Sequence, residues 1–204
     1  MATLLRLDAS SRLDGSYSRQ LADRFVDHWQ TIDSQCQVIT RDLIRQPIPH
    51  IAQATITGFY TPASDYTPEL QQAVSLSNEL IAELKVADVI IISTPMYNFS
   101  VPSALKAWID HVVRAGETFS FSPETGFQGL VHDKRAFVLT AAGAVFSTAA
   151  MQPLDFLSPY LKTLLSFLGI TDIEIISLEG TTIDTAAFER SQQAALNRIS
   201  QVQL

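Results

Sequence analysis

Four serines lie just before a predicted helix near the start of the chain. They are Ser10, Ser11, Ser16 and Ser18. Hydroxyl donors, free backbone N–H groups and the positive end of a helix dipole together suit a phosphate group, and Arg12 could add positive charge. The same serines could instead only cap the helix and solvate the loop. The residue types alone leave both interpretations open.

A second loop of unusual composition follows the apolar run 87–93. It contains Met96, Tyr97, Asn98 and Phe99. These residues combine flat apolar surfaces with backbone amides and one side-chain amide, and a flavin ring needs both kinds of contact. Taken singly, Tyr97 and Phe99 could be ordinary core aromatics. Gly143, after a later strand, could let the backbone approach such a ring closely or could simply make a turn.

Hydrophobic periodicity predicts the elements that must position these two loops. Five short apolar runs predict strands at residues 2–8, 36–40, 87–93, 136–141 and 173–178. Helical spacing between and after them predicts helices from about residue 18, over 68–86, from 102, over 154–168 and over 184–202. The second strand is the most polar, so we expect it at an edge of the sheet.

Alternation of strands and helices predicts an α/β fold with a parallel sheet and right-handed crossovers. Five strands favour the flavodoxin-like order 2-1-3-4-5, with helices on both faces. In that order the first and third strands are neighbours. The serine segment and the Met96–Phe99 loop are therefore expected to face each other across the binding crevice at the carboxyl edge.

Several details of the chain are also predicted. Segments 43–68 and 115–133 are expected to be long and irregular, and both are aromatic. Pro95 should end the third strand, and Pro102 should open the following helix. Pro159 should break or kink its helix, whereas Gly169 is placed as a helix C-cap.

Length and composition exclude several classes of protein. The 204 residues, 47% of them hydrophobic, predict a single domain over residues 1–204. The net charge of −7 is spread along the chain without a basic cluster, so no nucleic-acid partner is expected. No apolar run is long enough for a bilayer, and the N-terminus lacks signal-peptide features. With Cys36 as the only cysteine, a cytoplasmic protein without a membrane partner is expected.

Other chemistries find no support in the sequence. The G-x-G-x-x-G, Walker A and G-x-S-x-G patterns are absent, and the four histidines lack metal-ligand spacing. His111 is interpreted as part of a solvated helix face, on which Lys106, Asp110 and Arg114 form i,i+4 pairs. No metal site and no catalytic side chain is predicted.

Two motifs resemble those of a known family. The segment PMYNFSVPSALKAWIDHVVRAGETF closely resembles the signature of the FMN-dependent NADH:quinone oxidoreductases, also called azoreductases. The earlier ASSRLDGSYSRQLA resembles the phosphate loop of the same family. The resemblance follows the order of the family's segments across nearly the whole chain.

The resemblance implies a homodimer with one tightly bound FMN per subunit at the interface. Carried over by position, the residues expected to hold the phosphate are Ser10, Ser16, Tyr17 and Ser18. Those expected to hold the ring and ribityl chain are Met96, Tyr97, Asn98 and Phe99. Thr140 and Gly143 would contribute from the loop after the fourth strand. Many members have Ser-Arg-Gly-Gly there, whereas this chain has Thr140-Ala141-Ala142-Gly143, which leaves side-chain contacts at Ala141 in doubt.

The implied activity is two-electron, ping-pong hydride transfer from NADH or NADPH to a quinone or an azo compound. The chemistry would take place on the flavin, so no essential acid or base is expected. A flavodoxin-type carrier of single electrons is the alternative, although the sequence lacks the concentrated acidic face usual for such carriers. A flavin-free scaffold protein is a second alternative, suggested by the altered loop at Ala141.

Overall fold

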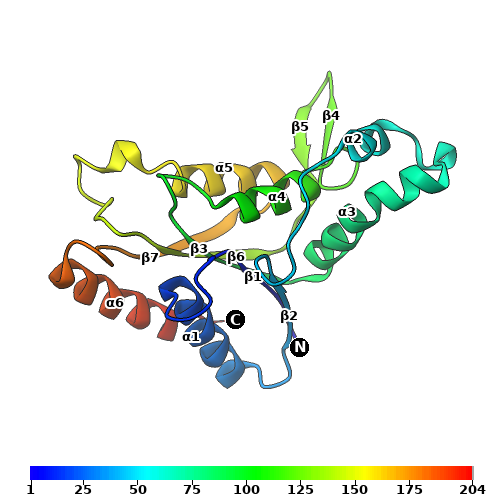
Figure 1. Ribbon diagram of the computed structural model, residues 1–204. Coiled ribbons are helices and arrows are strands. Elements are labelled where there is room, and N and C mark those ends of the chain that lie inside the picture. Colours follow the sequence, from blue (N-terminus) through cyan, green and yellow to red (C-terminus); the bar gives the residue numbers. More distant parts are fainter. Residues whose placement is uncertain (204) are drawn as a thin grey trace.

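A five-stranded parallel sheet forms the centre of the molecule, seen edge-on in Figure 1. The computed structural model describes residues 1–203. The strands are β1 (Thr3–Asp8), β2 (Gln37–Asp42), β3 (Val89–Pro95), β6 (Arg135–Ala141) and β7 (Asp172–Leu178). Their order is β2-β1-β3-β6-β7, which confirms the predicted order 2-1-3-4-5 and places the polar second strand at an edge.

Helices cover both faces of this sheet (Figure 1). They are α1 (Tyr17–Ile32), α2 (Gln53–Tyr60), α3 (Pro68–Val86), α4 (Ser103–Val112), α5 (Ser158–Leu168) and α6 (Thr185–Ser200). One face carries α1 and α6, and the other carries α3, α4 and α5. Among residues 1–203, no helix combines the length and the apolar character needed to cross a membrane.

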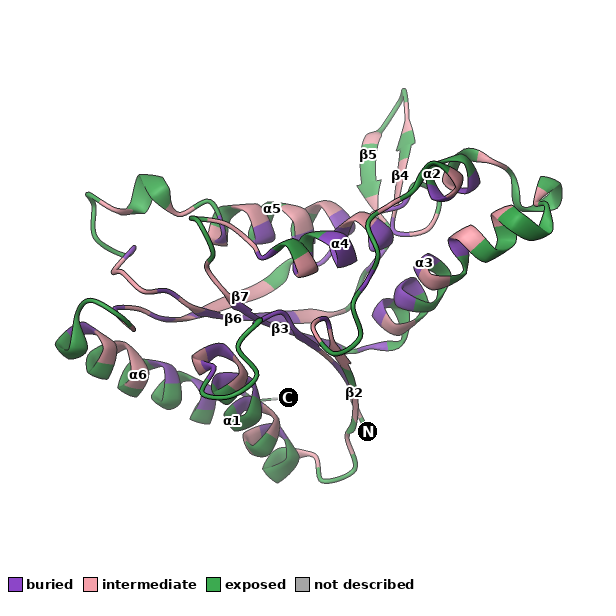
Figure 2. Ribbon diagram, viewed as in Figure 1, coloured by how far each residue is buried: buried purple, intermediate pink, exposed green. Residues whose placement is uncertain are grey.

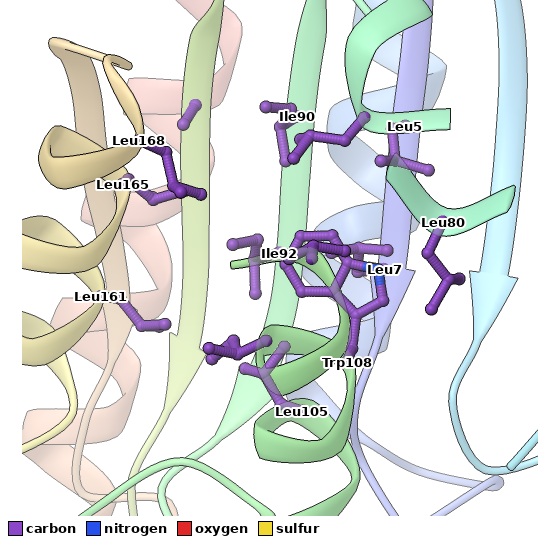
Figure 3. Close-up of a cluster of buried hydrophobic side chains, with 14 of the residues drawn as sticks. Leu5, Leu7, Leu80, Ile90, Ile92, Leu105, Trp108, Leu161, Leu165 and Leu168 are labelled. Atoms are coloured by element: carbon purple, nitrogen blue, oxygen red, sulfur yellow. The ribbon is translucent and has the colours of Figure 1, made fainter. Parts of the chain in front are cut away.

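Alternate residues of the central strands feed two separate cores. Leu5 and Ile90 point toward α3, α4 and α5, where they pack with Trp108 and Leu165 (Figure 3). Their neighbours Leu4, Val89 and Ile91 point the other way, toward α1 and α6. The central strands are therefore buried on both faces, whereas the outer sides of the helices are exposed (Figure 2), as expected for a parallel sheet.

The segment 43–68 contains a helix that was not predicted. It was expected to be irregular, but α2 and a short 3₁₀ helix at Ala63–Asp65 interrupt it. The residues of α2 are poor helix formers, with two threonines and a glycine, and no side chain caps its start. The helix is instead stabilised by packing on α3. Gly58 lies so close to Val74 of α3 that a Cβ atom on it would be 2.4 Å from Val74 Cγ1.

The segment 115–133 was also expected to be irregular and instead forms an antiparallel hairpin. Its strands are β4 (Phe119–Ser122) and β5 (Gly126–Gly129). The hairpin projects from the α4/α5 side of the molecule (Figure 1). Phe119 and Phe127 lie against Phe167 of α5, with ring centroids 4.8 Å and 5.6 Å away. This aromatic contact fixes the base of the hairpin on the domain.

Prolines mark element boundaries, but not always as predicted. Pro159 does not kink a helix, because α5 begins at Ser158 and Pro159 lies in its first turn, where a missing N–H costs nothing. Pro102 occupies the N-cap position just before α4. Pro95 is the last residue of β3, as predicted. The C-cap prediction at Gly169 is confirmed by its left-handed conformation, with φ of 103°.

Candidate functional site

A cavity of about 300 Å³ opens at the carboxyl edge of the sheet, where β1 and β3 end side by side. Its lining comes from both loops and from the loops after β6 and β7. The lining residues are Ser10, Arg12, Ser16, Tyr17, Ser18, Pro95, Met96, Tyr97, Ala141, Gly143, Thr181 and Thr182. The adjacency of β1 and β3 therefore brings the serine segment and the Met96–Phe99 loop to one site, as predicted.

The N-terminus of α1 forms one end of this cavity. Ser16 is the N-cap, and its hydroxyl lies 3.5 Å from the amide nitrogen of Arg19 and 3.4 Å from the hydroxyl of Ser18. Both serines are buried. The N–H groups of Tyr17 and Ser18 belong to the first turn of the helix and have no intrahelical acceptor. Two hydroxyls and free N–H groups at a positive helix end suit a phosphate.

A network of ion pairs lies behind the serine segment. The Arg19 guanidinium donates two hydrogen bonds to Asp42, of 2.8 and 2.9 Å, and one of 2.9 Å to the carbonyl oxygen of Ser10. These bonds from Arg19 lower the pKa of the Asp42 carboxyl to about 2, and the pKa of Arg19 is raised in turn. The Asp42 carboxylate therefore stays ionised at any pH near neutrality.

A tight turn forms the opposite wall. Tyr97 and Ser100 exchange backbone hydrogen bonds of 3.0 and 3.1 Å, and the two residues between them, Asn98 and Phe99, have φ of 49° and 71°. Positive φ at both central positions is the pattern of a type I′ turn, which favours Asn followed by Gly. A phenylalanine there is strained, and such strain is found preferentially at functional sites.

The segment between β6 and α5 holds this turn in place. The Phe99 ring meets Phe146 edge-on, with centroids 6.2 Å apart, and the Phe99 carbonyl accepts a hydrogen bond of 3.0 Å from the N–H of Phe156. Glu179 fixes the segment from the other side, because its carboxylate accepts bonds of 2.9 Å from the N–H groups of Phe146 and Ser147. The strained turn is thus supported by residues far away in sequence.

Comparison with known proteins identifies the family. A family model described as the flavodoxin-like fold matches residues 2–202. The chain is 41% identical over 202 residues to an FMN-dependent NADH:quinone oxidoreductase of Herminiimonas arsenicoxydans, an alignment that covers 99% of this chain and 98% of the relative. This chain belongs to the FMN-dependent NADH:quinone oxidoreductase family.

Other members of the family agree. A quinone oxidoreductase of the same name from Xanthobacter autotrophicus is 45% identical over 177 residues, 86% of this chain and 85% of that protein. The crystal structure of an FMN-dependent NADH-azoreductase from Bacillus anthracis, in complex with FMN, superimposes with a TM-score of 0.87 at 25% identity, covering 98% of this chain and 99% of that one.

The structure brings most of the predicted site residues together at the cavity. Seven of them line it: Ser10, Ser16, Tyr17, Ser18, Met96, Tyr97 and Gly143. Asn98 and Phe99 lie on the adjoining turn, outside the lining. Thr140 is placed differently, because it is buried within β6 and its hydroxyl donates to Ser177 at 2.9 Å. Its side chain is therefore turned into the sheet rather than into the cavity.

Thr181 and Thr182 also line the cavity, although neither was predicted as a site residue. Both follow β7 at the same edge of the sheet as the two predicted loops. The Thr182 N–H donates to the Gly143 carbonyl at 3.2 Å, and a Cβ atom on Gly143 would lie 3.1 Å from Thr182 Oγ1. Their position after the fifth strand was a signal available in the sequence, since every loop at this edge can contact a ligand.

The interpretation of a solvated helix face that includes His111 and Arg114 was wrong, and Arg114 lies after the end of α4. His111 is only 2% exposed and its Nε2 lies 3.0 Å from the Pro49 carbonyl oxygen. Arg114 is also buried and donates to Asn78 at 2.6 Å. Only Lys106 and Asp110 form the expected exposed ion pair. The two buried residues join α4 to neighbouring segments and lie outside the cavity lining.

Proposed function

We propose that this protein reduces quinones, and also azo compounds, with electrons from NADH, using FMN bound in the cavity between the serine segment and the Tyr97–Ser100 turn. The observation that carries the proposal is the joining of two different chemistries in one cavity. An anion-binding helix end faces an aromatic turn, and FMN has a phosphate and a flat ring at its two ends. NADPH is the alternative donor.

The serine end of the cavity fits the phosphate of FMN. Ser16 and Ser18 have hydroxyls that find only each other and one weak backbone contact within the described chain, so both can donate to a phosphate oxygen. The N–H groups of the first turn of α1 add further donors. We assign the phosphate to Ser10, Ser16, Tyr17 and Ser18.

The turn end of the cavity fits the ring and the ribityl chain. Tyr97 and Phe99 are 40% and 45% exposed, so their rings are available as apolar walls. Within residues 1–203 the N–H groups of Asn98 and Phe99 have no hydrogen-bond acceptor, so both are available to a polar ring edge. We assign the ring and chain to Met96, Tyr97, Asn98 and Phe99, with a backbone contact from Gly143; Thr140, which lies within β6, is not assigned a contact.

The lining explains why no catalytic side chain is assigned. It contains no carboxylate, imidazole, thiol or ammonium group in the part of the chain that the structure describes. When bound, FMN supplies the two-electron chemistry that links NADH to the acceptor. The residues of the cavity bind and orient it, and the aromatic turn shields one side from water. We propose a ping-pong order, in which the nicotinamide leaves before the acceptor enters, because both would react with the same flavin ring.

We also propose that the protein is a homodimer in the cytoplasm, with each FMN at the subunit interface. The β4–β5 hairpin supports this assembly, because it projects from the domain (Figure 2) and carries Phe121 and Phe127, which are 61% and 62% exposed. The two rings lie together, with centroids 4.9 Å apart, and a contiguous exposed apolar patch is typical of an interaction surface. The single cysteine is in keeping with a reducing compartment.

Anaerobic stopped-flow absorbance tests the activity. The purified protein is loaded with FMN and mixed first with NADH or NADPH, and then with a benzoquinone or an azo dye. We expect the flavin absorbance to bleach with NADH and to return with either acceptor. Absence of bleaching by both nicotinamides would overturn the assignment, and light scattering on the same sample would reveal a monomer if the dimer proposal is wrong.

A further inference from the structure

Arg19 is a partly buried cation beside the phosphate end of the cavity, yet it does not line that cavity. Its side chain is 12% exposed, and its donors are already used within the protein. Nη1 faces Asp42 at 2.8 Å and Asp8 at 3.5 Å. Nη2 faces Asp42 at 2.9 Å and the Ser10 carbonyl at 2.9 Å, and Nε faces the same carbonyl at 3.4 Å. No N–H remains for a phosphate.

Asp42 holds this guanidinium in one orientation. It ends β2, and its Oδ1 also accepts hydrogen bonds from the N–H groups of Ile44 and Arg45, of 3.0 and 3.2 Å. Two backbone donors thus fix the Asp42 carboxylate, which in turn binds both Nη1 and Nη2 of Arg19. The planar guanidinium therefore has little freedom to turn. The end of β2 thereby determines where the Arg19 donors point.

The third partner of Arg19 is the carbonyl of Ser10. Since the Ser10–Ser11 peptide is planar and trans, its N–H points away from its carbonyl. A carbonyl turned toward Arg19 therefore turns the Ser11 N–H away from Arg19, and within the described chain this N–H has no acceptor. Ser10 itself lines the cavity. The orientation of this peptide therefore depends on the ion pair behind it.

We propose that the Arg19–Asp42 ion pair positions the Ser10–Ser11 peptide and so organises the phosphate end of the site, while neither side chain contacts the phosphate. Both are positioning residues. The inference rests on the proposed binding of FMN in this cavity. The affinity of the site for the phosphate therefore depends on the edge strand β2, although β2 contributes no lining residue.

In a competing interpretation Arg19 binds the phosphate directly. This interpretation predicts the opposite change in FMN affinity when the Asp42 charge is removed. Loss of the Asp42 charge would free the guanidinium for the phosphate and tighten FMN binding. If Arg19 acts by positioning the Ser10 carbonyl, loss of the Asp42 charge lets the guanidinium turn and weakens FMN binding. Riboflavin, which has the ring and chain but no phosphate, separates an effect on the phosphate end from an effect on the whole site.

The test is titration of the apoprotein with FMN and with riboflavin, followed by quenching of flavin fluorescence. The variants are Asp42→Asn and Arg19→Lys, and Lys keeps the charge but loses the planar fork. Glu83→Gln is the matched control, because Glu83 pairs with Arg41, the β2 residue next to Asp42, but lies outside the cavity lining. Circular dichroism and urea unfolding verify that each variant is folded. If Asp42→Asn does not fold, the Arg19→Lys variant alone tests the inference.

We expect the Kd for FMN to rise at least tenfold in both variants, the Kd for riboflavin to stay within about twofold, and Glu83→Gln to match the wild type. Unchanged or tighter FMN binding in folded variants would overturn the inference, as would an equal loss of affinity for riboflavin. If the wild-type protein binds neither flavin, the proposed function itself fails. If the wild type and the variants all bind FMN equally well, only the positioning role is overturned and the proposed function stands.

Discussion

The N–H of Phe156 donates a hydrogen bond of 3.0 Å to the carbonyl oxygen of Phe99. This bond joins the segment before α5 to the turn after β3, and it holds a phenylalanine in the left-handed region, with φ of 71°. The turn is therefore maintained by tertiary contacts against its own local preference, because glycine is the favoured residue at that position of a type I′ turn. The strained backbone of Phe99 therefore lies in the turn beside the proposed flavin site.

Two substitutions at Phe99 distinguish the effect of backbone strain on stability from the effect of the aromatic ring on activity. Phe99→Ala and Phe99→Gly both remove the ring, but only glycine relieves the left-handed conformation. We expect Phe99→Gly to be more stable than Phe99→Ala by about 1 kcal/mol in urea unfolding of the apoprotein. Both variants should lose about tenfold or more in kcat/KM for a benzoquinone. Equal stability of the two would show that the turn is not strained.

The hydroxyl of Ser18 tests the phosphate assignment. Ser18 is 1% exposed and lies within 3.4 Å of the Ser16 hydroxyl. A hydrogen bond to a charged group contributes about 1.5 to 3 kcal/mol, so Ser18→Ala should raise the Kd for FMN by about tenfold or more. The Kd for riboflavin should be unchanged. Ser75→Ala, on the exposed side of α3, is the control; a similar loss there would show that the effect is not specific.

The close contact between Gly143 and Thr182 predicts a compensating pair. In Gly143→Ala the new methyl group would lie 3.1 Å from Thr182 Oγ1, so the loop after β7 must shift by a few tenths of an ångström. We expect FMN affinity to fall several-fold in the single variant. Part of it should return in Gly143→Ala/Thr182→Ala, measured by fluorescence titration. Additive losses in the double variant would argue against contact between the two loops.

Asp42 predicts the pH dependence of stability. The pKa of its carboxyl is about 2 in the folded protein and about 3.9 when unfolded. A lowered pKa contributes stability above the unfolded value, and that stability is lost as the pH falls through the folded value. Urea unfolding of the apoprotein should show wild type more stable than Asp42→Asn by about 1 kcal/mol at pH 6, after allowance for solvent screening.

The difference between these two proteins should shrink between about pH 4 and pH 2. The charged groups around Asp42 include Asp8, Arg19 and Arg45, and Arg19, whose pKa is raised by its hydrogen bonds to Asp42, remains charged throughout this window. A stability difference that stays constant down to pH 2 would show that the Asp42 charge does not stabilise the fold. The same variants serve for the flavin titrations above.

The hairpin tests the proposed dimer. Phe121→Ser removes an exposed ring from β4, and we expect the dimer dissociation constant to rise at least tenfold in analytical ultracentrifugation, because aromatic anchors dominate interface energies. FMN affinity should fall with it if the site lies at the interface. Ile32→Ser, which removes a partly exposed apolar side chain from the end of α1, should leave the dimer intact. A wild-type monomer with full FMN occupancy would contradict the assembly.

The sheet and the two loops of the site could be predicted from the sequence because their signals are local. Runs such as 87–93 show the apolar pattern of a buried strand, and the strand count together with the handedness of crossovers restricts the order. Serines before a helix and aromatics after a strand are read from neighbouring residues in the chain. Of the missed elements, α2 lacks such a pattern and is stabilised by packing on α3. The β4–β5 hairpin did carry a local signal, the alternating residues Phe119-Ser120-Phe121-Ser122 before a turn at Gly126, and its place on the domain is set by packing on α5.

The α/β order and the segments that reach the carboxyl edge are therefore predictable from the amino-acid sequence. The pairing of Arg19 with Asp42, the burial of His111 and the left-handed Phe99 held by Phe156 arise only in the folded chain. Each depends on residues that are distant in the chain and meet only after the strands have paired. A periodic pattern reports which face of an element is buried, but it carries no information on which distant side chain lies against that face.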